Sequence, residues 1–537
     1  MSKAEKYLLV FWFIINLIIG LFTVRDFGIS YDEPEYYLYA QNTVDAYKSF
    51  FALAYSPTFG PHDLPNYGPA FIIFPELVVR FLRSIFPNLL AANVWHFSYF
   101  FIFQLGGLCL YALARRWFEL WSAWGMLLLY TSQPLLWGHA FINPKDIPFM
   151  VFFLFTLWSG FRLADSLGAQ NICLSLKSNV DQFRNSGSIS FSLPRFTLKE
   201  SLPFLRSPEL ILAGALLGMT TSIRLLGPLP GLIVILYLAF TLRQKSIPVI
   251  AAYLICATIA MFITWPYLWP SPIDHWMDSL VLMVNFPWPG RVLFNGQFYD
   301  AENLPISYLP TLINIQLTES LIILIYLGLA LLIFFILRKS IKLDFFFVVL
   351  MGALLPLISL ILSRATMYDN FRQILFIFPP LMLLSGLALD LIFFILKPVA
   401  LRVALLVLLA FPGIYAIIQL HPYQYVYYNS FASGPGGAFR RFELDYWATS
   451  YHEAALWLNK NAPANAKIGG DGPIYLVELY LRPDLHLQQK NTPNEQVDYF
   501  ISTSRYNQDL TSYPTAKVIH SIERDGAVLT VIKQLSP

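Results

Sequence analysis

The sequence predicts an α-helical polytopic membrane protein with about eleven transmembrane helices and a soluble α/β domain at its C-terminus. Three observations predict this class. The chain of 537 residues is 56% hydrophobic, and only 13% of its residues are charged, against roughly 25% in ordinary globular proteins. Apolar runs of membrane-spanning length recur as far as about residue 420. Beyond that point the composition becomes polar, which indicates a separate domain.

The predicted spans are eleven apolar runs, each roughly as long as the hydrocarbon core of a bilayer requires. They lie at 7–23, 93–113, 121–138, 147–164, 209–226, 228–242, 246–264, 317–337, 344–363, 373–396 and 402–419.

A twelfth run, 66–87, is apolar but carries Glu76, Arg80 and Arg83. If the N-terminus is cytoplasmic and this run does not cross, the basic loops fall on the cytoplasmic side, as the positive-inside rule favours. We therefore predict that 66–87 forms a helix lying at the outer interface.

This topology divides the chain into a transmembrane module, residues 1–420, and a soluble extracytoplasmic domain, residues 421–537. Within the module, 24–92 is predicted to be an outer loop with interfacial helices. The segment 162–208 is serine-rich and basic, and is predicted to be a loose cytoplasmic loop. The segment 265–316 is dense in Trp, Tyr and Pro, and is predicted to be a large outer loop. The first run has no cleavage pattern after it, so we expect an uncleaved span in the plasma (inner) membrane.

The C-terminal domain has helical patterning over 450–461 and short β-type runs at 466–469, 497–501 and 527–532. Three cysteines in the whole chain give neither a disulfide framework nor a cysteine metal site. The net charge of +3 is too small to indicate a nucleic-acid partner.

Ionisable residues gather at the outer ends of the predicted spans and are rare in their middles. Charges at membrane depth are costly and usually mark a site. A transporter would be expected to hold them near the midplane, so their position favours a site at the outer face. The gathered residues are Asp26, Asp32, Glu33, His139, Lys145, Asp146, Arg224, Asp300, Glu302, Glu319, Arg364, Asp369 and Arg372.

These residue types suit group transfer from an anionic carrier. A carboxylate can act as general base, and fixed cations can hold a phosphate leaving group at the membrane surface. Simpler interpretations stay open. Asp32 and Glu33 precede a helix start at Pro34, where acids are common. Arg364 and Arg372 are also placed to snorkel from helix ends, and Lys145 to pair with its neighbour Asp146.

Several short motifs occur in a characteristic order. They are Asp32-Glu33, Asn66-Tyr67-Gly68-Pro69, the Ala-Arg-Arg-Trp ending at Trp117, Asn143-Pro144-Lys145-Asp146, and the segment Gly218 to Arg224. In this order they resemble the GT-C class of membrane glycosyltransferases, most closely the protein O-mannosyltransferase and aminoarabinose-transferase branch (glycosyltransferase family 39-like). The resemblance covers about residues 1–240, and the later spans match by topology.

The resemblance implies an inverting transferase that moves a sugar from a polyprenyl-phosphate donor to an acceptor at the non-cytoplasmic face. It implies Asp32 as catalytic base with Glu33 as its neighbour, and Lys145 and Arg224 as contacts to the donor phosphate. From their positions, Arg364, Arg372 and His139 are further phosphate-binding candidates. Other site candidates are Asp146, Tyr31 and Glu302.

The chain departs from the family at Arg224, where a lysine followed by glycine is common and two leucines follow here. The first loop has no Asp-X-Asp, unlike the metal-dependent oligosaccharyltransferases, and the mannosyltransferases' trefoil domain has no counterpart. No metal site or cofactor is predicted, although a divalent metal stays open. The expected acceptor is a lipid, a glycan or a protein. The alternative functions are a lipid or polysaccharide transporter (flippase) and a catalytically silent scaffold.

Overall fold

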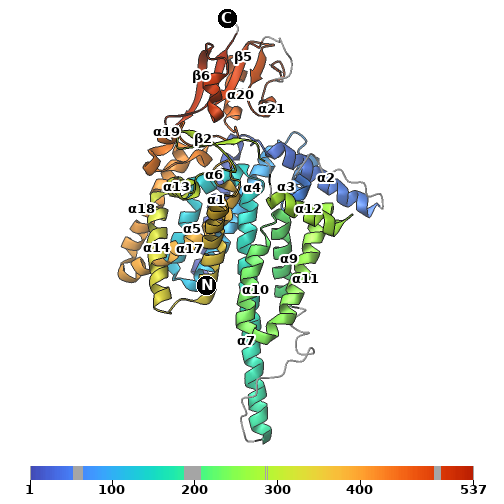
Figure 1. The fold of residues 1–537 in the computed structure, drawn as a ribbon, viewed down its shortest axis with the longest axis vertical. Coiled ribbons are helices and arrows are strands. Elements are labelled where there is room, and N and C mark those ends of the chain that lie inside the picture. The colour runs from blue at the N-terminus through green and yellow to red at the C-terminus, as the bar shows by residue number, and fades with distance from the viewer. Residues whose placement is uncertain are drawn as a thin grey trace.

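A computed structural model describes residues 2–52, 64–186, 207–284, 286, 288–488 and 497–535. Figure 1 shows a helical bundle with a small sheet domain at one end. Among the described residues, eight helices are long and apolar enough to cross a membrane. The chain is therefore a multi-pass helical membrane protein, as predicted, and the orientation of its termini stays a prediction.

All eleven predicted spans lie on helices. They correspond to α1 (Lys3–Thr23), α4 (Ala91–Trp117), α5 (Leu120–Thr131) with α6 (Pro134–Ile142), α7 (Asp146–Ser186), α9 (Pro208–Ile223), α10 (Pro228–Leu242), α11 (Ser246–Thr264), α14 (Glu319–Leu337), α15 (Leu343–Val349) with α16 (Leu355–Ser363), α17 (Phe378–Ile395) and α18 (Val399–Gln419).

Eleven runs yield eight long apolar helices for three reasons. The helix α9 has only 16 residues. The run 121–138 is divided between α5 and α6, where Pro134 lacks the backbone N–H that would continue the first helix. The stretch Pro228–Thr264 counts once, although it contains both α10 and α11.

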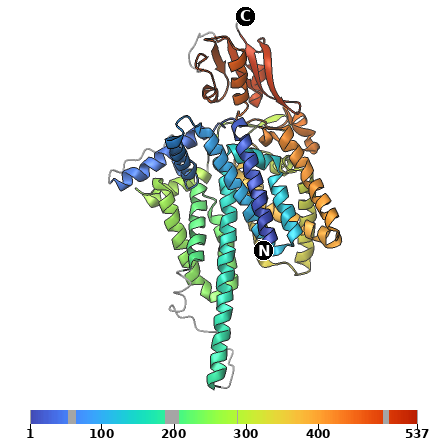
Figure 2. The same ribbon diagram turned by 180° about the vertical axis from the view of Figure 1, so that it is seen from behind.

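The structure corrects the predicted cytoplasmic loop over 162–208. The helix α7 continues from Asp146 to Ser186, 41 residues in all, and projects well beyond the other helices (Figures 1 and 2). No proline lies between 162 and 186, so nothing in the sequence stops a helix that is already formed. Polar residues were mistaken for a loop signal. Residues 187–206 lie outside the described part of the chain.

The two predicted outer loops contain regular structure. The first holds α2 (Glu33–Phe51) and α3 (Ile73–Ile85). Arg80 of α3 forms an ion pair with Glu76 of the same helix (2.7 Å) and a second with Asp45 of α2 (3.1 Å), which joins the two helices. The second holds α12 (Pro272–Val284), a hairpin of β1 (Arg291–Phe294) and β2 (Gln297–Asp300), and α13 (Tyr308–Gln316). The helices α2, α3 and α12 lie at the same end of the bundle as the sheet domain (Figure 1).

The C-terminal domain is α/β, as predicted. Its sheet has the strand order β4-β3-β5-β7-β6, in which β3 pairs in parallel with β4 and β5, and β7 runs antiparallel to β5 and β6. The predicted helix is α20 (Tyr451–Asn461), and the predicted strands are β3 (Lys467–Gly470), β5 (Tyr499–Thr503) and β7 (Ala527–Gln534). The strands β4 (His486–Leu487) and β6 (Lys517–Arg524) were not predicted, because these edge strands lack a clear apolar face.

A connecting stretch, residues 421–449, packs onto the bundle and leads into the sheet domain. At Gly138 of α6, an added Cβ would come within 2.3 Å of the backbone nitrogen of Tyr425, so only glycine permits this approach. Asn429 Nδ2 donates to the carbonyl oxygens of Asn314 and Leu317, both at 2.8 Å. These contacts fix the stretch that carries Trp447 over the end of the bundle.

Candidate active site

A cavity of about 420 Å³ lies between the end of the bundle and the sheet domain. Six separate parts of the chain bring charged or aromatic side chains to its wall. They are the turn and first residues of α2, the stretch at Tyr67, the start of α7, the loop with Phe286 and Trp288, the loop that ends at Arg372, and the C-terminal part of the chain. The lining includes Tyr31, Asp32, Lys145, Asp369, Arg372, Trp447 and Arg505. A cavity with convergent charged groups is the expected form of a binding site.

Asp32 stands at the cavity end of α2, in the N-cap position. Its side chain is 25% exposed, and its Oδ2 lies 3.4 Å from Nη2 of Arg372. Burial raises the pKa of Asp32, and the positive charges of Arg372 and Lys145 act in the opposite direction. A carboxylate of raised basicity that still opens to the cavity can accept a proton from a bound molecule.

Glu33 points away from the cavity and is fully buried, which corrects the expectation that both acids share the site. Its carboxylate accepts hydrogen bonds from Ser30 N–H (2.7 Å) and Tyr37 OH (2.8 Å), and lies 3.0 Å from Nε2 of His96. Ser30 Oγ in turn donates to the carbonyl of Ile142 (2.9 Å). Glu33 therefore holds the turn that presents Asp32.

Glu33→Ala is expected to destabilise the protein by about 3 kcal/mol, because it leaves three buried polar groups without their acceptor. Thermal unfolding in detergent measures this. Glu35→Ala, an exposed acid two positions along, is the matched control and should stay within about 0.5 kcal/mol. Equal stability of the two variants would contradict the structural role of Glu33.

The start of α7 is organised by Asn143. Its Oδ1 accepts hydrogen bonds from the backbone N–H groups of Lys145 (3.1 Å) and Asp146 (2.7 Å), which is how asparagine caps a helix. The carboxylate of Asp146 forms ion pairs with Arg224 and with Nη1 of Arg372 (3.4 Å). Asp146 is thus held by arginines, and it does not pair with its neighbour Lys145.

Lys145 reaches the cavity without a carboxylate partner within ion-pairing distance among the described residues. Its Nζ lies 3.8 Å from the centre of the Tyr67 ring and 5.8 Å from that of Tyr36. Burial, reinforced by the charge of Arg224, lowers the pKa of Lys145 to about 7. The site therefore presents a cation that a bound anion can satisfy.

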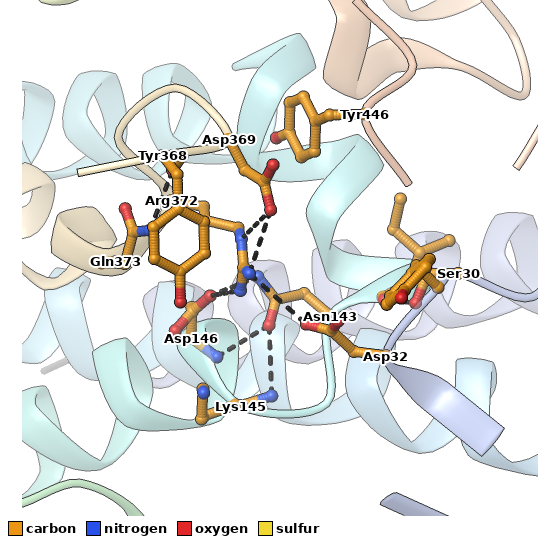
Figure 3. A network of polar contacts seen from close by, with 12 residues as sticks. Ser30, Asp32, Asn143, Lys145, Asp146, Tyr368, Asp369, Arg372, Gln373 and Tyr446 are labelled. Carbon is orange, nitrogen blue, oxygen red and sulfur yellow. Dashed lines mark hydrogen bonds and ion pairs between the residues drawn. The ribbon is translucent and has the colours of Figure 1, made fainter. Parts of the chain in front are cut away.

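Arg372 is the centre of the polar network in Figure 3, where it lies among three carboxylates. Its guanidinium is 3.1 Å from Asp369 and 3.4 Å from both Asp32 and Asp146, and it packs over the ring of Trp447. This side chain is buried and does not snorkel. Asp369 has a left-handed backbone (φ +53°), a strained conformation of the kind found at functional sites.

The remaining predicted residues divide into two groups. Arg224 lies behind the cavity wall, bound to Asp146 and to the carbonyl of Gln373 (2.9 Å). His139 is buried, with its Nε2 3.0 Å from Tyr446 OH, and supports the wall without lining it. Arg364 and Glu302 are exposed and lie outside the lining, so the structure corrects both as site candidates.

Several wall residues were not predicted, and most come from the C-terminal part of the chain. Arg505 follows β5, and its Nη2 lies 2.5 Å from Oδ1 of Asp369. Tyr446 and Trp447 come from the connecting stretch. Charged residues that follow a strand are common on protein surfaces, so Arg505 did not stand out in the sequence. Nothing in the sequence predicted its contact with Asp369, 136 positions earlier.

No protein-family model and no curated protein sequence matches the chain. Among solved structures, it is similar to ArnT from Cupriavidus metallidurans in the apo state, at 13% identity and a TM-score of 0.49, over 99% of this chain and 98% of that one. The same protein bound to undecaprenyl phosphate gives 13% identity and a TM-score of 0.47, with the same coverage.

A further similar structure is the archaeal oligosaccharyltransferase AglB from Archaeoglobus fulgidus, in complex with an inhibitory peptide and a dolichol-phosphate. It gives 13% identity and a TM-score of 0.45, over 94% of this chain and 70% of that one. ArnT is an aminoarabinose transferase, and both proteins lie in the GT-C class that the sequence resembles. At 13% identity these similarities concern the fold, and the chemistry of the site follows from its own side chains.

Proposed function

We propose that this protein is a membrane glycosyltransferase of the GT-C class, which moves a sugar from a polyprenyl-phosphate donor to an acceptor hydroxyl. One observation carries the proposal: the carboxylate of Asp32 and the ammonium of Lys145, which has no ion-pair partner among the described residues, line the same cavity at the end of an apolar bundle. A lipid-linked phosphate can enter from the bilayer at that depth, and a soluble acceptor can enter from water.

In the proposed reaction the acceptor oxygen attacks the anomeric carbon while Asp32 takes the hydroxyl proton. The bond from that carbon to the phosphate oxygen breaks, and polyprenyl phosphate leaves with the electron pair. Lys145 stabilises the charge that develops on the phosphate, and it does so without reorganising. A single displacement of this kind inverts the anomeric centre. We place the cavity and the sheet domain at the outer face of the inner membrane.

The test is consumption of labelled polyprenyl-phosphate sugars by the purified protein in lipid nanodiscs. We expect polyprenyl phosphate to be released together with sugar transferred to an acceptor or to water, for at least one sugar class. The same preparation in vesicles, with lipid movement between leaflets as readout, tests the transporter alternative. Lipid movement without donor consumption would replace the transferase proposal.

A further inference from the structure

Five charged side chains beside the cavity form one row of alternating sign. The row runs from Arg224 in the bundle to Arg505 in the sheet domain, and Figure 3 shows its centre. Arg224 pairs with Asp146, Asp146 with Arg372 (3.4 Å), Arg372 with Asp369 (3.1 Å), and Asp369 with Arg505 (2.5 Å). Among the described residues, Asp32 forms an ion pair with this row at its centre alone, through Arg372 (3.4 Å).

The carboxylates in this network are not equally compensated. Asp146 and Asp369 each have an arginine besides Arg372, whereas Arg372 is the one arginine in ion-pairing distance of Asp32 among the described residues. Arg372 is also closer to Asp369 than to Asp32. The stabilisation of ionised Asp32 by Arg372 therefore depends on two other ion pairs. These pairs are Asp146 with Arg224 and Asp369 with Arg505.

We propose that Arg505 is a positioning residue for the reaction: by neutralising Asp369 from the sheet domain, it leaves the charge of Arg372 available to Asp32. The proposal rests on the proposed function only where it makes Asp32 the base. Without Arg505, two acids compete for one guanidinium, and the nearer one is Asp369. Asp32 then keeps its proton to higher pH. The sheet domain thereby acts on Asp32 through Asp369 and Arg372.

The other groups around Asp32 act in known directions. Lys145, at the start of α7, favours the ionised form, while Asp146 and Asp369 oppose it. Burial raises the pKa of four neighbouring tyrosines, so they stay neutral below pH 9; they are Tyr31, Tyr36, Tyr368 and Tyr475. Glu443 lies 3.8 Å from Arg505, and burial raises its pKa to about 7, so it competes for Arg505 only above that pH.

The experiment measures the titration of Asp32 without relying on turnover. A hydrophobic carbodiimide reacts with protonated carboxyls, and mass spectrometry of the full-length protein in nanodiscs reports its labelling of Asp32 between pH 4 and 9. For Arg505→Gln we expect the labelling midpoint to rise by about one pH unit. For Asp369→Asn we expect the labelling midpoint to fall, because Arg372 then has one competing carboxylate fewer and stabilises ionised Asp32 more strongly. A purely structural role would not give shifts of opposite sign.

Two further variants complete the test. Arg505→Lys keeps the charge and should return the midpoint to within about 0.3 unit of the starting protein. Arg440→Gln is the matched control, since it removes another arginine paired with an aspartate, Asp509 at 2.6 Å, outside the cavity lining. Its midpoint should not move.

In donor assays the acid limb of kcat/KM should follow the labelling midpoints. Unchanged midpoints in both Arg505→Gln and Asp369→Asn would overturn the proposal. If the labelling midpoints shift as expected but neither the starting protein nor any variant consumes donor, the effect of Arg505 on Asp32 is supported and the proposed function fails instead.

Discussion

Asp32→Asn is expected to lower the rate of sugar transfer by about 10²- to 10⁴-fold, the usual contribution of a general base. The amide has nearly the same size as the carboxylate and can still contact Arg372, but it cannot take up the acceptor proton. Donor binding should be equal or tighter, because the variant removes a negative charge that faces the donor phosphate. The loss should therefore fall on kcat and not on the affinity for donor.

Single-turnover transfer and equilibrium donor titration on the same preparation separate these two quantities. Glu35→Gln is the matched control, since Glu35 also lines the cavity from α2 and is exposed to solvent. We expect it to retain turnover within a few-fold. Normal turnover in Asp32→Asn would rule out Asp32 as the base. If Glu35→Gln then showed the expected loss instead, Glu35 would be assigned that role.

Donor affinity is expected to depend on the protonation of Lys145. Its pKa is lowered to about 7 by burial, so the side chain is charged below that pH and neutral above it. The donor is a phosphodiester whose charge is constant between pH 6 and 9. Affinity should therefore decline above pH 7, by up to about tenfold per pH unit. Lys145→Ala should lose about 10- to 100-fold in affinity at pH 6, the value of one charged hydrogen bond, and little at pH 9.

Titrations of a polyprenyl-phosphate sugar at pH 6, 7, 8 and 9 check this dependence. Lys145→Arg should hold its affinity over the whole range, because guanidinium does not titrate there. Lys48→Ala, an exposed lysine of α2 that pairs with Asp45, is the control and should match the starting protein. A flat profile in the starting protein would show that Lys145 does not bind the phosphate.

The bundle and one half of the site were predictable because their signals are local. Spanning helices follow from the lengths of apolar runs, and Asp32 and Lys145 stand within a few residues of predicted span ends. The division of roles between adjacent acids was not predictable. Asp32 and Glu33 face different environments because one side chain turns to the cavity and the other to Ser30 and His96, and sequence adjacency carries no information on that.

The other half of the site depends on contacts between distant parts of the chain. Arg372 was expected to be a candidate cation, but its three carboxylate partners come from α7 and two separate loops. Arg505 needed the position of the whole sheet domain. The exposed Arg364 and Glu302 show the converse. Arg364 follows a predicted span end and Glu302 lies in the large outer loop, yet neither lines the cavity.

The cavity joins Asp32, near the beginning of the chain, with Arg505, near its end. During synthesis the earlier spans enter the membrane first, and strand β5 can pair only after the ribosome has passed it. A nascent chain halted before this point has Asp32 and Lys145 but not the wall of the cavity that Arg505 supplies. We expect chains truncated before β5 to insert into the membrane but to lack the proposed transferase activity, so that the activity would require the sheet domain.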